Sequence, residues 1–507
     1  MLIACMKHCV LQHKTLSVIT WAVTFTVGCL FMCLVGEYNF CYLEQWGTFF
    51  YDCHYVMSEL CSYGGGARHV GSWLTQFFVV PWVGIAITAA LLSCVVTLFA
   101  DVLYRLTKSE HLLPSTLFPV SILMLLLFNV NCQYSYLVSM LLFAVALALH
   151  VRISGEWLRC VVAVVSAILL FMAAGQIATL YACVVLVVEL LRDWRKGVRY
   201  LLLPAVVGVM GLYVVRAGWV GTWKHVFLPD GYFTLRLSAG TSMYLPCGLT
   251  VALFAVATLY RRFVARNAKV VVALVAFQCV GVTAFVATNV PKYISADNEA
   301  FKRLNHLASH EAWDDIVSYC KHKPMTNVLH QNIFNMALAE KGALVTEVVK
   351  YPNIGVQSLF ISGDKNPYIL AMLSDVYFSM GHIAFSQLYA FEANESNGNV
   401  SPRMLKRLAL TSAIYDNKPL ARKYIALLEK TLFYRTWADD MRRALDGDTA
   451  SPLAEVLATK RACLFPDNRF SGSKGLDNDL EEILKVAPEH HATSQYLETI
   501  RLFIPTK

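Results

Sequence analysis

The chain has 507 residues, of which 57% are apolar and only 15% charged, well below the roughly 25% of charged residues in a typical soluble domain. Its net charge is +8. The whole positive excess lies in residues 1–290, because the rest of the chain contains equal numbers of basic and acidic side chains. A nucleic-acid-binding protein usually carries a basic patch on its soluble part. The composition therefore excludes nucleic acid as an expected partner and favours a membrane protein.

Apolar stretches alternate with short polar loops through residues 1–290, and every second loop is basic. With the N-terminus inside, the inside segments hold 14 Lys and Arg residues and the outside loops hold four, which is the bias that orients membrane proteins. An odd number of spans places everything after residue 290 outside. We therefore predict an integral membrane protein with a cytoplasmic N-terminus and a C-terminal domain on the far, extracytoplasmic side of the membrane. The nine predicted spans are residues 16–35, 73–100, 116–130, 136–151, 160–174, 177–191, 200–215, 244–260 and 270–290.

The outside loop at residues 36–72 is rich in acidic and aromatic side chains. Residues 39–61 predict an amphipathic helix that lies along the membrane surface, with its aromatic side chains as interfacial anchors. A second interpretation is an acidic site at the membrane surface, in which Glu37 and Glu44 are the candidate catalytic residues. A carboxylate held against lipid without a partner would have a raised pKa, which suits a general base.

The other long outside loop, residues 216–243, is basic and aromatic. Aromatic residues are common at a membrane–water interface, which is the simpler explanation for them. Guanidinium groups also suit phosphate, so a lipid-phosphate substrate facing the acidic loop is the functional alternative. The candidate substrate-binding residues are Arg216, Trp219, Trp223, Lys224 and Arg236.

Residues 291–507 predict one helix after another, with breaks at glycine and proline. Residues 367–400 resemble a tetratricopeptide repeat, and residues 402–435 repeat the pattern more weakly. This resemblance implies an α-solenoid of paired helices with a concave face for a protein partner, in which Tyr377 and Ala393 are buried between helices. The predicted fold is therefore all-α: a polytopic transmembrane helical bundle in residues 1–290 followed by a tetratricopeptide-like solenoid in residues 291–507.

The sequence contains no motif for a metal or a cofactor. None of its 15 cysteines forms a C-x-x-C pair, and no Cys/His spacing is that of a zinc site. Cys53 and Cys61 are the one locally plausible disulfide, with free thiols as the simpler alternative. We therefore predict neither a metal site nor a cofactor.

Three stretches of the chain stand out: Leu74-Thr75-Gln76-Phe77-Phe78 with Pro81-Trp82, Asn335-Met336-Ala337-Leu338-Ala339-Glu340-Lys341-Gly342, and Lys430-Thr431-Leu432-Phe433-Tyr434. They resemble an uncharacterised family of polytopic inner-membrane proteins from Bacteroidota. This resemblance implies a location in the bacterial inner (plasma) membrane, with the C-terminal domain in the periplasm, but no mechanism. The layout also resembles multi-span lipid-linked-sugar glycosyltransferases, which can carry tetratricopeptide domains and place a catalytic acid in the first outside loop. This chain lacks the paired acidic residues often seen there.

These patterns support two functions from different classes. In the first, the membrane half anchors a docking platform for envelope assembly, and the partners are membrane lipid and a protein bound to the solenoid. In the second, the protein is a membrane glycosyltransferase-like enzyme that uses a lipid-linked sugar. A lipid-lined cavity between loops 36–72 and 216–243 would favour the enzyme, and a solidly packed membrane half would favour the platform.

Overall fold

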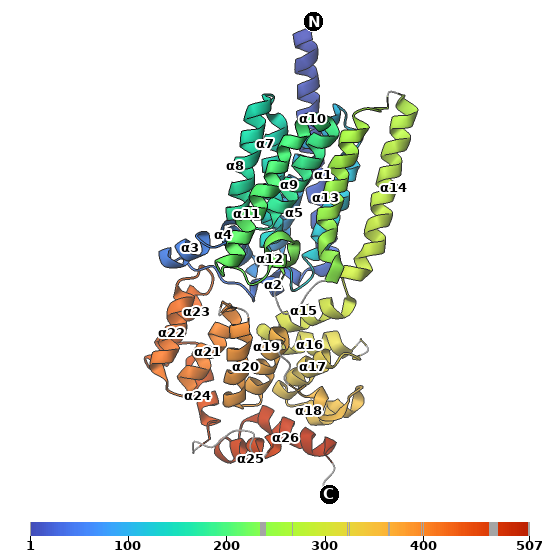
Figure 1. The fold of residues 1–507 in the computed structure, drawn as a ribbon. Coiled ribbons are helices and arrows are strands. Elements are labelled where there is room, and N and C mark those ends of the chain that lie inside the picture. The colour runs from blue at the N-terminus through green and yellow to red at the C-terminus, as the bar shows by residue number, and fades with distance from the viewer. Residues whose placement is uncertain are drawn as a thin grey trace. The chain divides into compact units, whose positions relative to one another are not determined.

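The structure is a computed structural model, and its described residues are mainly helical (Figure 1). These residues are 2–233, 240–265, 267–321, 323, 325–362, 366–396, 398, 400–465 and 475–504, with only the backbone described for 2–14. Within them no β-strand occurs, apart from one isolated bridge between Cys132 and Phe233. The chain divides into two units. We call Met1–Phe40 with Cys53–Ser295 the membrane unit, and Cys41–Asp52 with Ala296–Lys507 the helical unit.

The membrane unit is a bundle of apolar helices linked by short turns. Its helices are α1 (Leu2–Gly36), α2 (Asn39–Glu44, whose last residues belong to the helical unit), α3 (Cys53–Leu60), α4 (Gly65–Thr75), α5 (Pro81–Thr107), α6 (Leu117–Leu126), α7 (Ser135–Arg152), α8 (Glu156–Ala174), α9 (Ile177–Arg192), α10 (Trp194–Gly197), α11 (Leu202–Arg216), α12 (Trp223–Phe227), α13 (Leu245–Tyr260) and α14 (Ala268–Tyr293). Short 3₁₀ turns precede α5, α6, α11 and α13.

Seven helical stretches of the described chain are long and apolar enough to cross a membrane, which marks the protein as a membrane protein. The predicted count of nine is not confirmed, because α6 has 10 residues and α9 has 16. At about 1.5 Å per residue, a helix of the length of α9 covers roughly 24 Å of a hydrocarbon core about 30 Å thick. The seven stretches are Thr15–Gly36, Pro81–Thr107, Ser135–Arg152, Glu156–Ala174, Trp194–Arg216, Gly240–Tyr260 and Ala268–Tyr293.

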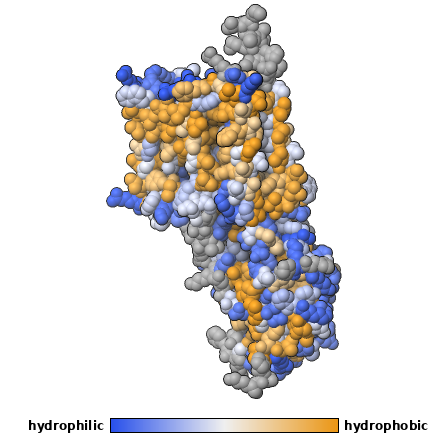
Figure 2. Space-filling model, turned by 90° about the vertical axis from the view of Figure 1, so that its right-hand side faces the viewer, coloured by the Kyte–Doolittle hydropathy of each residue, from blue (hydrophilic) through white to orange (hydrophobic). Residues whose placement is uncertain are grey.

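The outer surface of the bundle is apolar, as a surface in contact with lipid must be. Large side chains such as Leu34, Leu169 and Phe277 are more than 60% exposed, and Figure 2 shows a belt of hydrophobic residues with hydrophilic residues at both ends. The interior is packed with aromatic rings, among them Phe99, which contacts Phe143 and Phe254 edge-on. The helices of the bundle therefore have one apolar face in the packed interior and another apolar face exposed on the outside.

The helical unit is built from consecutive helices that pack on their neighbours. Helix α19 packs on α20, α20 on α21, α21 on α22 and α22 on α23, while α26 returns against α17 and α18. Tyr377 and Ala393 are 5% and 0% exposed, which confirms the prediction that both are buried. The helices are α15 (Ala296–Ser309), α16 (Trp313–Lys321), α17 (Val328–Glu340), α18 (Leu344–Glu347), α19 (Pro367–Ser379), α20 (Ile383–Ser396), α21 (Pro402–Ile414), α22 (Lys418–Glu429), α23 (Arg435–Leu445), α24 (Ala454–Ala462), α25 (Leu476–Val486) and α26 (His491–Phe503).

Local sequence sets where these helices begin and turn. The Asn366 side chain accepts a hydrogen bond from the Tyr368 N–H at the start of α19, and Ser401 does the same for Met404 at the start of α21, as N-cap residues do. Gly381, between α19 and α20, has φ of +77°, and a Cβ there would lie 3.1 Å from Cys463 Sγ. Only glycine meets both conditions without strain.

Candidate functional site

The residues Cys41–Asp52, here called the inserted segment, come from the first long loop but form part of the helical unit. Trp46 lies edge-on to Tyr368, with ring centroids 4.5 Å apart, and the Tyr42 ring centroid lies 6.2 Å from that of Phe301. Trp46 also packs against the apolar cluster formed by α19, α20 and α21. Seven of the segment's side chains are less than 9% exposed: Cys41, Tyr42, Glu44, Gln45, Thr48, Phe49 and Phe50.

This placement corrects the prediction of a single surface helix over residues 39–61. The structure has two short helices, α2 and α3, and residues 45–52 between them are not helical. Turn hydrogen bonds from the Trp46 and Gly47 N–H groups end α2. The reason is tertiary, because four of the aromatic side chains expected to anchor in lipid, those of Phe40, Tyr42, Phe49 and Phe50, are buried in protein instead.

Hydrogen bonds along the main chain hold the inserted segment to two loops of the helical unit. The Ser401 hydroxyl donates to the Gln45 carbonyl at 2.8 Å, and the Thr48 hydroxyl donates to the Val400 carbonyl at 2.7 Å. Farther along, the Tyr51 N–H donates to the Lys430 carbonyl at 2.7 Å. Buried backbone groups need such partners, so the segment is fixed in register and not merely covered.

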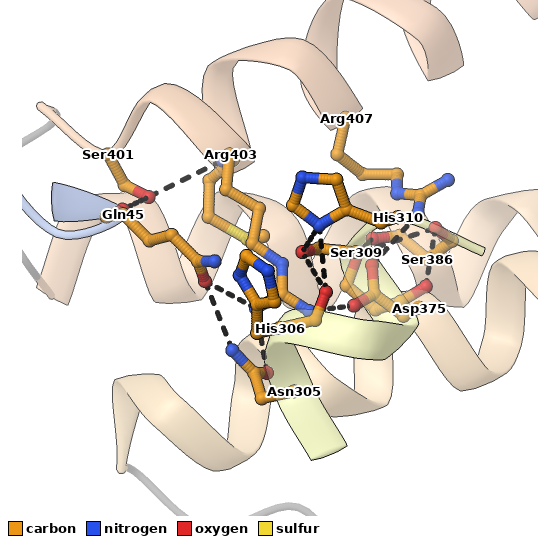
Figure 3. Close-up of polar contacts among 12 residues, drawn as sticks. Gln45, Asn305, His306, Ser309, His310, Asp375, Ser386, Ser401, Arg403 and Arg407 are labelled. Atoms are coloured by element: carbon orange, nitrogen blue, oxygen red, sulfur yellow. Dashed lines mark hydrogen bonds and ion pairs between the residues drawn. The ribbon is translucent and has the colours of Figure 1, made fainter. Parts of the chain in front are cut away.

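Arg403 is the side chain that connects the inserted segment to three helices (Figure 3). Its Nη1 donates to Gln45 Oε1 at 2.9 Å and to Asn305 Oδ1 at 2.7 Å. Its Nη2 pairs with a carboxylate oxygen of Asp375 on α19, and Arg407, one turn further along α21, donates to the other oxygen at 2.8 Å. The Asn305 amide also donates to Gln45 Oε1 at 3.1 Å. A planar guanidinium can serve several acceptors in one plane, which this position requires.

The carboxylate of Asp375 is ionised in this setting. Burial acts to raise its pKa, but the charges and hydrogen bonds of Arg403 and Arg407 outweigh burial and hold the pKa below its usual range. The three side chains are between 12% and 16% exposed. Removing one member of such a buried group leaves uncompensated charge and is strongly destabilising.

Glu44, at the end of α2, is in the opposite situation. Burial raises its pKa to about 8, although the hydrogen bond from Tyr434 and the charge of Lys406 act to lower it. The Tyr434 hydroxyl donates to Glu44 Oε1 at 2.6 Å, and the Lys406 ammonium lies 5.8 Å from the Tyr434 ring centroid. Glu44 is therefore mostly a neutral acid at pH 7.

The other predicted site residues that the structure describes belong to the membrane unit. Glu37 follows the end of α1 and is exposed, and Arg216 is the last residue of α11 and also exposed. Trp219 and Trp223 are 53% and 57% exposed. The Lys224 ammonium lies 6.0 Å from the Trp223 ring centroid. Arg236 lies outside the described residues. None of the others lines the cavity at the basic end of the membrane unit or the small cavity between α1 and α5.

Sequence reasoning missed Asp375, Arg403, Arg407 and Tyr434. One signal was present: Arg403 and Arg407 are four residues apart and so share a helix face. Nothing in the sequence linked them to Gln45, which is more than 350 positions away.

The fold defines an all-helical membrane protein that carries a second helical unit. The chain belongs to a family of unknown function (DUF6057), whose sequence model matches residues 12–503. No curated protein and no solved structure matches it.

Proposed function

We propose that this protein is a membrane-anchored docking platform, whose helical unit binds an extended segment of a partner protein during envelope assembly. The observation that carries the proposal is the inserted segment. It is bound by the helical unit as a peptide would be, through aromatic anchors, main-chain hydrogen bonds and one buried arginine. Tryptophan, tyrosine and arginine are also the residues that dominate binding energy at protein interfaces.

The packing of successive helices supports a tetratricopeptide-like solenoid. Such stacks present extended binding surfaces. In this chain one of those surfaces is occupied by the inserted segment, which ties the helical unit to its anchor at both ends of that segment as well as at Ser295. Helix α20 exposes Leu388 and Phe391 on one face, 46% and 49% respectively.

We also propose that the membrane unit crosses the bacterial inner membrane nine times. Its basic end then lies on the cytoplasmic side. Helix α9 is short for a span, but most of its side chains are buried and it packs between α8 and α13. A helix surrounded by protein does not have to match the thickness of the lipid. The charge bias of 14 against four Lys and Arg residues then gives the orientation.

The test is native mass spectrometry of the full chain purified in mild detergent. We expect a second polypeptide at a fixed stoichiometry. It should be lost from the double variant Leu388→Asp/Phe391→Asp and retained by the matched control Leu502→Asp, which changes an exposed leucine, 54% accessible, on α26. Equal binding of the partner by both variants would contradict docking at α20.

One observation favours the alternative, a glycosyltransferase-like enzyme using a lipid-linked sugar. Glu44 has a pKa of about 8, a value suited to a general acid or base near neutral pH. The same mass spectra distinguish this function from docking. If a lipid-linked sugar co-purifies with the wild type and is lost from Glu37→Gln or Arg216→Gln, the protein is the enzyme and the docking proposal is wrong.

A further inference from the structure

A cavity of about 400 Å³ opens at the basic end of the membrane unit, within the range of about 300–1,000 Å³ typical of ligand sites. Four segments surround it: the start of α8, the end of α9, the turn formed by α10 and the residues after it, and the residues after α13. Figure 2 shows hydrophilic residues over this end of the unit. The cavity shares no residue with the inserted segment, so a ligand bound in it is independent of the docking function.

The cavity is strongly cationic, because six basic side chains line it and only three carboxylates do. The carboxylates are already engaged. Glu189, 8% exposed, pairs with Arg159 and Arg192, Glu156 pairs with Lys196, and Asp193 accepts the hydrogen bond that begins α10. The basic residues are Arg159, Arg192, Lys196, Arg199, Arg261 and Arg262.

Three arginines keep their charge available to a ligand. Among the described residues no carboxylate lies within ion-pair distance of Arg199, Arg261 or Arg262. Arg262 donates to the Leu191 carbonyl at 2.9 Å, which orients its guanidinium without neutralising it. Arginine side chains bind phosphate oxygens through paired hydrogen bonds, so these groups favour a phosphate ester as the ligand.

The surroundings of the cavity are those of a membrane–water boundary. Two candidate spans begin at Glu156 and Trp194, and a third ends at Tyr260. Trp157, Trp194 and Phe263 are 79%, 66% and 78% exposed, as aromatic residues at a lipid interface are. Basic pockets between membrane helices at this level bind anionic lipid headgroups.

We propose that this cavity binds the phosphate ester of an anionic phospholipid headgroup. The acyl chains would then lie along exposed apolar side chains next to the cavity, such as Leu158 on α8 and Leu202 on α11, which are 56% and 50% exposed. A soluble phosphate ester has the same chemistry without the chains, and the experiment separates the two sources.

The full chain, purified in detergent and stripped of lipid, is incubated with phosphatidylglycerol or with phosphatidylcholine, and bound lipid is measured by native mass spectrometry. We expect phosphatidylglycerol to bind and phosphatidylcholine not to. The double variant Arg199→Gln/Arg261→Gln should weaken phosphatidylglycerol binding by about tenfold or more, because it removes charged hydrogen bonds to the phosphate. If that pair expresses poorly, Arg261→Gln alone should give a smaller loss.

The matched control is Arg195→Gln/Lys269→Gln, which removes the same charge from the same end of the unit. Both residues are exposed and neither lines the cavity, so binding should stay within about twofold of the wild type. A parallel arm uses glycerol 3-phosphate. If it binds as tightly as the lipid and with the same dependence on the two arginines, the ligand is a soluble phosphate ester and the lipid source is wrong. If neither ligand depends on Arg199 and Arg261, the cavity is not a phosphate site.

Discussion

Replacing Glu44 with Gln should change how the stability of the helical unit depends on pH. The folded-state pKa of Glu44 is about 8 and its ordinary value is 4.5. Because the folded state keeps a proton that the unfolded state releases, the stabilising contribution is complete below pH 4.5 and is lost as the pH rises towards 8. One pKa unit corresponds to about 1.4 kcal/mol. The free energy of unfolding contributed by Glu44 therefore falls by about 5 kcal/mol over this pH range.

Glutamine has the same shape, still accepts the hydrogen bond from Tyr434 and cannot ionise. The Glu44→Gln variant should therefore gain about 2–3 kcal/mol relative to the wild type between pH 6 and pH 8. For a unit of this size that corresponds to roughly 4–12 °C in the midpoint of thermal unfolding. Glu37→Gln is the matched control, because Glu37 is exposed in the membrane unit, and its pH dependence should be that of the wild type.

The assay heats the full chain in detergent at pH 6 and at pH 8. A brief thermolysin pulse at one common pH then reports the fraction of the helical unit that resists cleavage. If Glu44→Gln and the wild type lose the same number of degrees between pH 6 and pH 8, Glu44 does not carry a raised pKa and the reasoning is wrong.

Three further results are expected. Asp375→Asn should destabilise the helical unit by about 3–5 kcal/mol in the same proteolysis assay, because it leaves Arg403 and Arg407 buried without their carboxylate; an unchanged midpoint would contradict the ion pair. Because the pKa of Asp375 is lowered in the folded state, the stabilisation that its ion pairs give to the helical unit should be retained above pH 4. That stabilisation should be lost as the pH falls through the folded-state pKa. Ala393→Trp should overpack the contact between α20 and its neighbours, where Ala393 is 0% exposed, at a cost of about 1–3 kcal/mol; wild-type stability would show that the site has room. A reporter active only in the cytoplasm, fused to the C-terminus, should be silent, and activity there would overturn the proposed orientation and the nine crossings.

The helical class of this protein and its association with a membrane could be predicted from the sequence. Both depend on properties that act locally along the chain. A run of apolar residues long enough to span lipid is a span candidate wherever it occurs. The break predicted at Gly381 falls between α19 and α20, and the spacing of Tyr377 and Ala393 correctly placed both in the interior.

The contacts of the first long loop depend on the tertiary structure. Cys41–Asp52 has the composition of an interfacial segment, and aromatic side chains occur both at membrane interfaces and inside proteins. Only the folded helical unit brings Tyr368, Ser401 and Arg403 close enough to bind this segment. All three lie more than 300 residues after it in the sequence. The ionisation states of Glu44 and Asp375 have the same cause. Two carboxyl groups of similar intrinsic acidity diverge because one is buried beside a tyrosine hydroxyl and the other between two guanidinium groups.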